Sequence, residues 1–132
     1  MKILIDTHIL LWAIFDPSKL SKKESAIIKN PENIILVSAA SLWEISLKYS
    51  KGQLNLVRCI PTALPSILVE DGFELIDLTP QETAGSFILP KTTHSDPFDR
   101  MIIWQAIFRQ IPLLTRDEKL KEYTNYGLQL AF

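Results

Sequence analysis

Cysteine, long apolar runs and surplus positive charge are all scarce in this sequence. Its single cysteine, Cys59, cannot form an internal disulfide, and the chain has no cysteine pair that could bind zinc. No stretch of about 18 apolar residues occurs, and the first apolar segment is too short for a signal peptide and is interrupted by Asp6. We therefore expect a soluble, cytoplasmic protein without a membrane partner, in which any metal has oxygen ligands.

The charge balance excludes proteins that are held on nucleic acid by charge alone. Fourteen basic and fifteen acidic side chains give a net charge of -1, so a nucleic-acid substrate could be bound only through local patches. With 132 residues and 47% hydrophobic content, the chain can bury one core. No repeat, low-complexity tract or linker divides it, so we predict a single domain over residues 1–132.

Short apolar runs alternate with helical segments along the chain. The runs lack polar alternation, which is typical of strands covered on both faces. This alternation of strands and helices predicts an α/β fold, a three-layer sandwich with a mostly parallel central sheet and helices on both faces. The strands are expected at residues 2–5, 34–37, 73–78 and 112–115, with residues 128–132 as a candidate last strand.

Several residues mark where the helices begin and end. Ser21 and Thr79 each begin a capping box, and Pro80 after Thr79 suits the first helical position. Gly52 and Gly72 indicate helix ends.

Acidic residues follow two of the expected strands. Asp6 follows residues 2–5 and Asp117 follows residues 112–115. Because parallel strands direct their carboxyl ends to one edge of the sheet, the two carboxylates should share a cleft. Each could equally be a simple cap for the helix that follows it.

The segment around Asp99 favours a functional carboxylate. The helix expected over residues 98–110 is apolar around nearly its whole circumference, which predicts burial. An ionised Asp99 on such a helix is costly without a partner. Asp96, followed by Pro97, is the natural cap of this helix, so Asp99 is less needed for capping.

Glu44 is predicted by periodicity to lie on the polar side of its helix, together with Ser41, Lys48 and Lys51. Ser41 and Glu44 also fit a capping box, and the Glu44 to Lys48 spacing favours an ion pair. These patterns favour a surface role. A functional role requires this polar stripe to border the cleft.

Basic and histidine residues lie next to the acids. Arg100 and Arg116 are the candidate phosphate contacts because each adjoins an acid. His8 and His94 could be metal or substrate ligands, although two separated histidines are more often ordinary polar residues with local hydrogen bonds.

Carboxylates that share one cleft repel each other unless a divalent cation neutralises them. Oxygen ligands without thiolates suit magnesium, with manganese as the alternative. Hydrolysis of a phosphodiester is the reaction that such a site serves best.

Four motifs in order resemble those of the PIN-domain ribonucleases, specifically the VapC-type toxins of toxin-antitoxin pairs. The resemblance spans nearly the whole chain, and although each motif is weak alone, four in this order are fairly specific. The motifs are Leu4-Ile5-Asp6-Thr7-His8 with Leu11-Trp12, Ser41-Leu42-Trp43-Glu44-Ile45, His94-Ser95-Asp96-Pro97-Phe98-Asp99-Arg100, and Leu114-Thr115-Arg116-Asp117.

The resemblance implies a PIN-like fold and a magnesium-dependent endoribonuclease that acts on RNA. It also implies a homodimer held inactive by a cognate antitoxin protein. It assigns Glu44 to the site, against the periodicity. The implied catalytic acids are Asp6, Glu44, Asp99 and Asp117, of which Asp6 and Asp99 are the direct metal ligands and Glu44 and Asp117 further candidates. Thr7, Asp96 and Thr115 are implied to support this cluster.

Two other functions remain open at this point. One is a phosphoryl-transfer protein on a similar sheet, although Asp6-Thr7-His8 supplies only one of the paired acids that this class needs. The other is a non-catalytic protein-binding module that uses its apolar helix, with Met101, Trp104 and Phe108, to recruit a partner. For these three side chains, burial in the core is the simpler explanation.

Overall fold

Four short parallel strands form the centre of the molecule. The computed structural model describes residues 1–92 and 94–132. The strands are β1 (Lys2–Ile5), β2 (Ile34–Ser38), β3 (Glu74–Ile76) and β4 (Leu113–Leu114). Their order across the sheet is β3-β2-β1-β4, and every pairing is parallel. The candidate strand at residues 128–132 is not formed as a strand, because only an isolated bridge joins Leu113 to Leu130.

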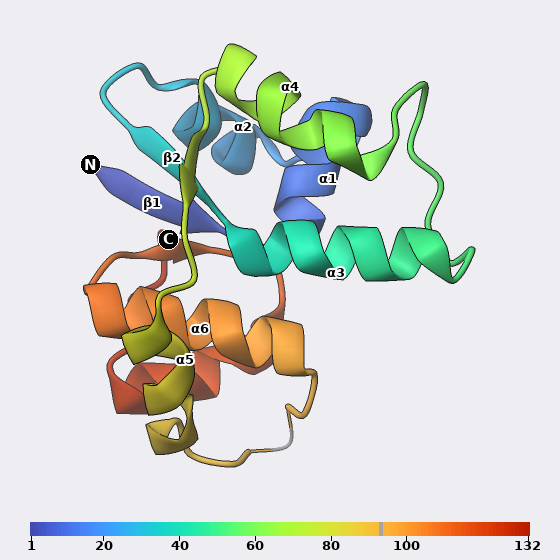
Figure 1. The fold of residues 1–132 in the computed structure, drawn as a ribbon. Helices are drawn as coiled ribbons and strands as arrows, with labels where there is room; N and C mark the ends of the chain where they lie inside the picture. The colour runs from blue at the N-terminus through green and yellow to red at the C-terminus, as the bar shows by residue number, and fades with distance from the viewer. Residues whose placement is uncertain (93) are drawn as a thin grey trace.

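Helices cover both faces of this sheet. Figure 1 shows α1, α2 and α4 on one side of the strands and α5 and α6 on the other, with α3 between the two groups. The predicted three-layer α/β fold is therefore confirmed. None of the helices within residues 1–92 and 94–132 is long and apolar enough to cross a bilayer. The helices are α1 (Thr7–Phe15), α2 (Lys22–Lys29), α3 (Ala39–Ser50), α4 (Leu64–Glu70), α5 (Pro80–Gly85) and α6 (Pro97–Arg109), and the 3-10 segments are η1 (Pro17–Lys19), η2 (Pro61–Ala63), η3 (Ser86–Ile88) and η4 (Glu118–Tyr126).

The predicted helix boundary signals are present. In the capping box of α2, the Glu24 backbone N–H donates to the Ser21 hydroxyl over 3.0 Å, and the Ser21 N–H donates to the Glu24 carboxylate over 2.8 Å. Thr79 begins the same arrangement at α5. Gly52 and Gly72 follow α3 and α4 with φ values of +70° and +92°, a backbone conformation that glycine adopts without steric cost.

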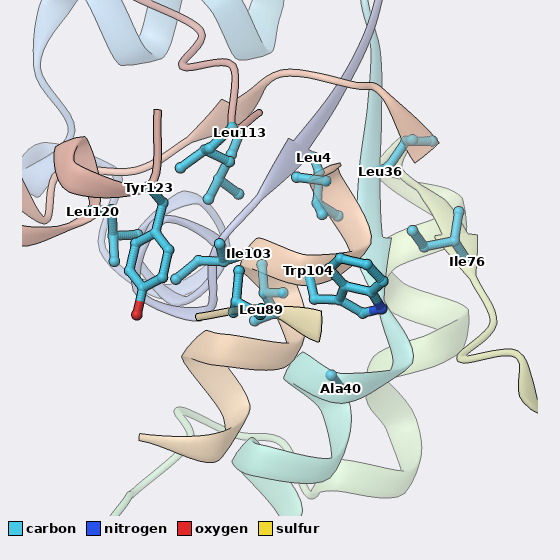
Figure 2. Close-up of a cluster of buried hydrophobic side chains, with 13 residues drawn as sticks. Leu4, Leu36, Ala40, Ile76, Leu89, Ile103, Trp104, Leu113, Leu120 and Tyr123 are labelled. Carbon is cyan, nitrogen blue, oxygen red and sulfur yellow. The ribbon is translucent and has the colours of Figure 1, made fainter. Parts of the chain in front are cut away.

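Alternation along the strands divides the apolar side chains between two cores. Leu4 and Leu36 belong to the core on the side of α6, where Figure 2 shows Leu4 near Trp104 and Leu36 near Ile76. Ile5, one position along, belongs to the core on the side of α1 and α4. Because successive strand residues point to opposite faces, strands buried on both sides need an unbroken apolar run.

Helix α6 is buried, as its apolar circumference predicts. Ile102, Ile103 and Trp104 are all buried, and the Trp104 indole N–H donates to the Glu82 carbonyl over 2.9 Å. Trp104 is thus a core residue, whereas Met101 is half-buried and Phe108 is 49% exposed. The core explanation holds for Trp104.

A buried polar network joins α5 to α6. The Glu82 side chain is 1% exposed and receives two hydrogen bonds from Arg109, at 2.7 and 3.0 Å. Burial opposes the charge of Glu82, but the hydrogen bonds from Arg109 and Thr79 prevail and lower the pKa of Glu82 to about 2. Gln105 donates to the same carboxylate over 3.3 Å. This ion pair therefore stabilises the packing of α5 on α6.

Arg109→Met, which keeps the apolar length of the side chain, is expected to lower the free energy of unfolding by about 3 kcal/mol at pH 7 because it leaves a buried charge unpaired. Since the folded pKa of Glu82 lies below its ordinary value of 4.5, the stabilisation is complete above that value and lost as the pH falls toward 2. Urea denaturation at several pH values measures both effects. Glu82→Gln in the Arg109→Met background should recover part of the loss, and equal stability of all variants would contradict the assignment.

Candidate active site

The site lies where the order of the strands reverses. The chain proceeds from β1 to β2 and β3 in one direction and then places β4 on the opposite side of β1. In open α/β sheets, ligands bind in the crevice beyond the carboxyl ends of the strands at such a switch point. Asp6 directly follows β1, and Asp117 follows β4 by three residues. The topology therefore brings both residues to the same crevice.

Asp6 is both a helix cap and a buried acid. Its carboxylate accepts a hydrogen bond of 2.9 Å from the Ile9 backbone N–H at the start of α1, and the residue is 8% exposed. Burial raises the pKa of the Asp6 carboxyl, against hydrogen bonds from Thr115 and Ile9 and the charge of His8, and the charge of Asp99 raises it further. The interpretation of Asp6 as a helix cap is thus confirmed. Capping alone does not explain why the site contains a carboxylate whose charge is disfavoured by burial.

Asp99 lies in the first turn of α6, where Asp96 performs the capping. The Asp96 carboxylate accepts from the backbone N–H groups of Phe98 and Asp99 at 2.9 and 3.0 Å, as predicted for the cap. The Asp99 carboxylate instead contacts His94 Nε2 at 2.9 Å. Burial raises the pKa of Asp99, the hydrogen bond from His94 opposes this, and the charges of Asp96 and Glu44 add to the rise.

Glu44 is buried, so the surface position that periodicity predicts is wrong. Helix α3 begins at Ala39 with Ser38 as its cap, which places Ser41 inside the helix and excludes the predicted Ser41 capping box. The first part of the polar stripe faces α1, where the Thr7 hydroxyl donates to Ser41 over 3.0 Å, whereas Lys51 at its other end is exposed. Glu44 is 2% exposed.

The two oxygens of Glu44 have different surroundings. Lys48 Nζ lies 2.5 Å from Oε2, which confirms the ion pair expected from their spacing. Oε1 is buried and has no hydrogen-bond partner among the described residues. An unpaired buried carboxylate oxygen is costly and has the capacity to bind a further donor or a cation.

Asp117 completes the group through His94 and Thr115. His94 Nδ1 lies 3.9 Å from the Asp117 carboxylate, on the ring whose Nε2 contacts Asp99. The Thr115 hydroxyl accepts from the Asp117 backbone N–H over 3.1 Å, and the Thr115 side chain lies close enough to the Asp6 carboxylate to lower its pKa. His94 thus links Asp99 to Asp117, and Thr115 links Asp117 to Asp6, so that the three acids are joined through these two residues. We call them, with Glu44, the cleft acids.

The two predicted phosphate contacts are engaged by other groups of the protein. Arg100 donates to the carbonyl oxygens of Leu89 and Pro90 and to the Tyr123 hydroxyl, over 3.0 to 3.2 Å. Arg116 Nε donates to Glu24 over 3.1 Å. These contacts give both arginines a structural role that the sequence did not suggest.

The donor chemistry of the cleft fits a hard divalent cation. All four cleft acids offer oxygen atoms, burial disfavours the charge of Asp6 and Asp99, and one Glu44 oxygen is unpaired. Within the part of the chain that the structure describes, no three His, Cys, Asp or Glu side chains are already arranged to hold a metal ion. Lys48 forms an ion pair with Glu44, and His94 contacts both Asp99 and Asp117.

The sheet order and these acids together define an α/β protein with acidic side chains near the carboxyl ends of β1 and β4, two of which, Asp6 and Asp117, line one hollow. Residues 3–125 match the PIN domain, and the chain belongs to this family. The resemblance inferred from the four motifs is therefore confirmed.

Similar proteins agree with this membership. The chain is 26% identical over 121 residues to a protein named Ribonuclease VapC22 from Mycobacterium tuberculosis (strain ATCC 25618 / H37Rv), covering 92% of this chain and 91% of that protein. A crystal structure of VapBC2 from Rickettsia felis, bound to a DNA fragment from its promoter, is similar with a TM-score of 0.71 at 25% identity, covering 98% of this chain and 97% of that one. DNA-bound VapBC from Salmonella typhimurium shares the fold, with a TM-score of 0.66 at 20% identity over 98% and 96% of the two chains.

Asp6→Asn is expected to raise the melting temperature of the metal-free protein at neutral pH, roughly 4 °C for 1 kcal/mol. Asparagine caps a helix as well as aspartate does, and the substitution removes a charge that burial disfavours. Because the folded pKa of Asp6 is raised, this gain should shrink as the pH falls through that pKa. Differential scanning calorimetry measures the shift. Glu32→Gln, at an exposed loop position, is the matched control, and a lower melting temperature for Asp6→Asn alone would contradict the argument.

Proposed function

We propose that this protein is a magnesium-dependent endoribonuclease and the toxin of a type II toxin-antitoxin pair. The observation that supports the proposal is the linkage of Asp99 to Asp117 through His94 and of Asp117 to Asp6 through Thr115. Buried Glu44 lies close enough for its charge to affect the pKa of Asp99. The ribonuclease name of the Mycobacterium tuberculosis relative supports the reaction class.

In this proposal Asp6 and Asp99 hold the metal, with Glu44 and Asp117 as further ligands. A divalent cation supplies charge neutralisation at the cleft and at the phosphodiester that is hydrolysed. Thr115 orients Asp6 and Asp117, the Thr7 hydroxyl holds α1 against Ser41 of α3, and Asp96 caps α6 so that Asp99 remains available.

The proposed biological setting includes a cognate antitoxin. The similar structures from Rickettsia felis and Salmonella typhimurium are VapBC complexes, which supports an antitoxin partner for this chain. We further propose a homodimer in the cytoplasm, where RNA is available and where a chain with one cysteine needs no disulfide.

Purified protein is expected to cut single-stranded RNA with magnesium and to lose this activity with a chelator. Asp6→Asn, Asp99→Asn and Glu44→Gln should each lower the cleavage rate by roughly 100-fold or more, because each removes a charge that faces the cation. Gel analysis of a labelled RNA gives the rates, with Glu32→Gln as the control. If Glu44→Gln kept full activity while the two aspartate variants lost it, the catalytic set would be smaller than four.

Magnesium is expected to raise the melting temperature of the wild-type protein but not that of the Asp6→Asn/Asp99→Asn double variant. A ligand that binds only the folded state at 100 times its dissociation constant stabilises by about 2.7 kcal/mol. Thermal denaturation with and without the ion measures the shift. A wild-type protein that is insensitive to divalent ions would favour the protein-binding module, and an aspartyl-phosphate trapped with a small phosphodonor would favour phosphoryl transfer.

A further inference from the structure

We propose that a hollow beside the cleft acids binds one unpaired nucleobase of the RNA, at a nucleotide adjoining the phosphate that is cut. The inference rests on the proposed function and names the part of the substrate that the site recognises. The hollow has a volume of about 280 Å³ and is lined by Asp6, His8, Trp12, Arg116 and Asp117. We call it the base hollow.

The size of the base hollow suits a single flat ring. Its volume lies just below the range of about 300–1,000 Å³ that is typical of small-molecule sites. Two of the cleft acids, Asp6 and Asp117, form part of its lining, so a group bound there is next to the proposed metal site. A nucleotide attached to the scissile phosphate meets both conditions.

Its walls are the surfaces on which proteins stack bases. The guanidinium of Arg116 packs over one face of the Trp12 ring, 4.4 Å from its centre, so a base would stack on the remaining surface of this pair and on His8, whose ring centre lies 6.0 Å from that of Trp12 at an interplanar angle of 50°. His8 is exposed and Trp12 is half-buried. Single-stranded RNA is recognised by stacking of splayed bases on aromatic rings and on arginine planes.

Arg116 is held rigidly in place before any ligand arrives. Its Nε and Nη2 donate to the two oxygens of Glu24, and Nη2 also donates to the Lys19 carbonyl over 2.6 Å. Glu24 is itself fixed by the capping box with Ser21. The plane beside Trp12 is therefore pre-organised, which reduces the entropy lost on binding.

The charges around the base hollow favour a neutral base over a phosphate. The positive charge of Arg116 is paired with Glu24, and the carboxylates of Asp6 and Asp117 in the lining repel anions. A carboxylate oxygen of Asp6 or Asp117 that is not bound to the metal can instead accept a hydrogen bond from an N–H group on the edge of a base. An acidic ligand is disfavoured for the same reason.

The test measures binding in the absence of divalent metal, so that it does not depend on cleavage. Fluorescence anisotropy gives the dissociation constant of a short labelled single-stranded RNA. The same measurement is made on a series of RNAs of that sequence, each of which lacks the base at one nucleotide. For the wild-type protein, removal of one particular base should weaken binding by about 10-fold. Trp12→Leu should bind the intact RNA about as weakly as the wild type binds that abasic RNA. Removal of the base should not weaken the binding of this variant any further.

Two further variants make this result specific. Trp43→Leu changes an exposed tryptophan that is next to Glu44 but outside the base hollow, and it should remain as sensitive to the missing base as the wild type. His8→Ala alters an exposed lining residue and should reduce the sensitivity even if Trp12→Leu fails to fold.

Three outcomes would overturn the base hollow. They are equal binding of all the RNAs by the wild type, full base sensitivity in both Trp12→Leu and His8→Ala, and loss of sensitivity in Trp43→Leu. Base-dependent binding without any metal-dependent cleavage would uphold the base hollow and refute the nuclease, so the two proposals fail separately.

Discussion

The parallel pairing of β1 with β4 is the constraint on which the site depends. Leu4 pairs with Leu113 and Ile5 with Leu114, and this register places Asp6 within reach of the Thr115 hydroxyl. A shift of one residue would exchange the faces of every side chain on the strand and move Leu4 out of the core against α6. The two apolar cores therefore fix the register, and the register fixes the positions of the cleft acids. The pairing of β1 with β4 thus serves both the packing of the cores and the placement of the cleft acids.

Acids that are partly or fully removed from solvent fall into two groups in this molecule. Glu24 and Glu82 each have an arginine that makes two hydrogen bonds, and the pKa of each is lowered. Asp6 and Asp99 have no such partner among the described residues, and burial raises the pKa of both. Acids that are paired with arginine stabilise the packing of helices. Acids without such a partner lower the stability of the fold, and a bound cation would offset this cost. The same residue types thus serve structure in one place and chemistry in another.

Local signals in the sequence were sufficient for much of this arrangement. The strands, the caps at Ser21, Thr79 and Asp96, and the meeting of Asp6 with Asp117 follow from patterns within a few residues and from the rule for parallel sheets. Glu44 could not be placed in this way, because the start of α3 at Ala39 and its contact with α1 decide which face of the helix is buried. The partner of Arg116 was also out of reach, since Glu24 lies 92 positions away.

The pairing of Arg116 with Glu24 also bears on how a chain of net charge -1 could hold RNA. Once paired, the guanidinium contributes a flat surface beside Trp12 and little net charge. Stacking on such a surface does not require neutralisation of many phosphates, so it does not depend on the broad positive field that the sequence lacks. The contact between Glu24 of α2 and Arg116 in the loop after β4 therefore helps to position the adjacent Asp117. It also shapes the surface beside Trp12. Stacking of bases is therefore a mode of RNA binding that is compatible with a net charge of -1.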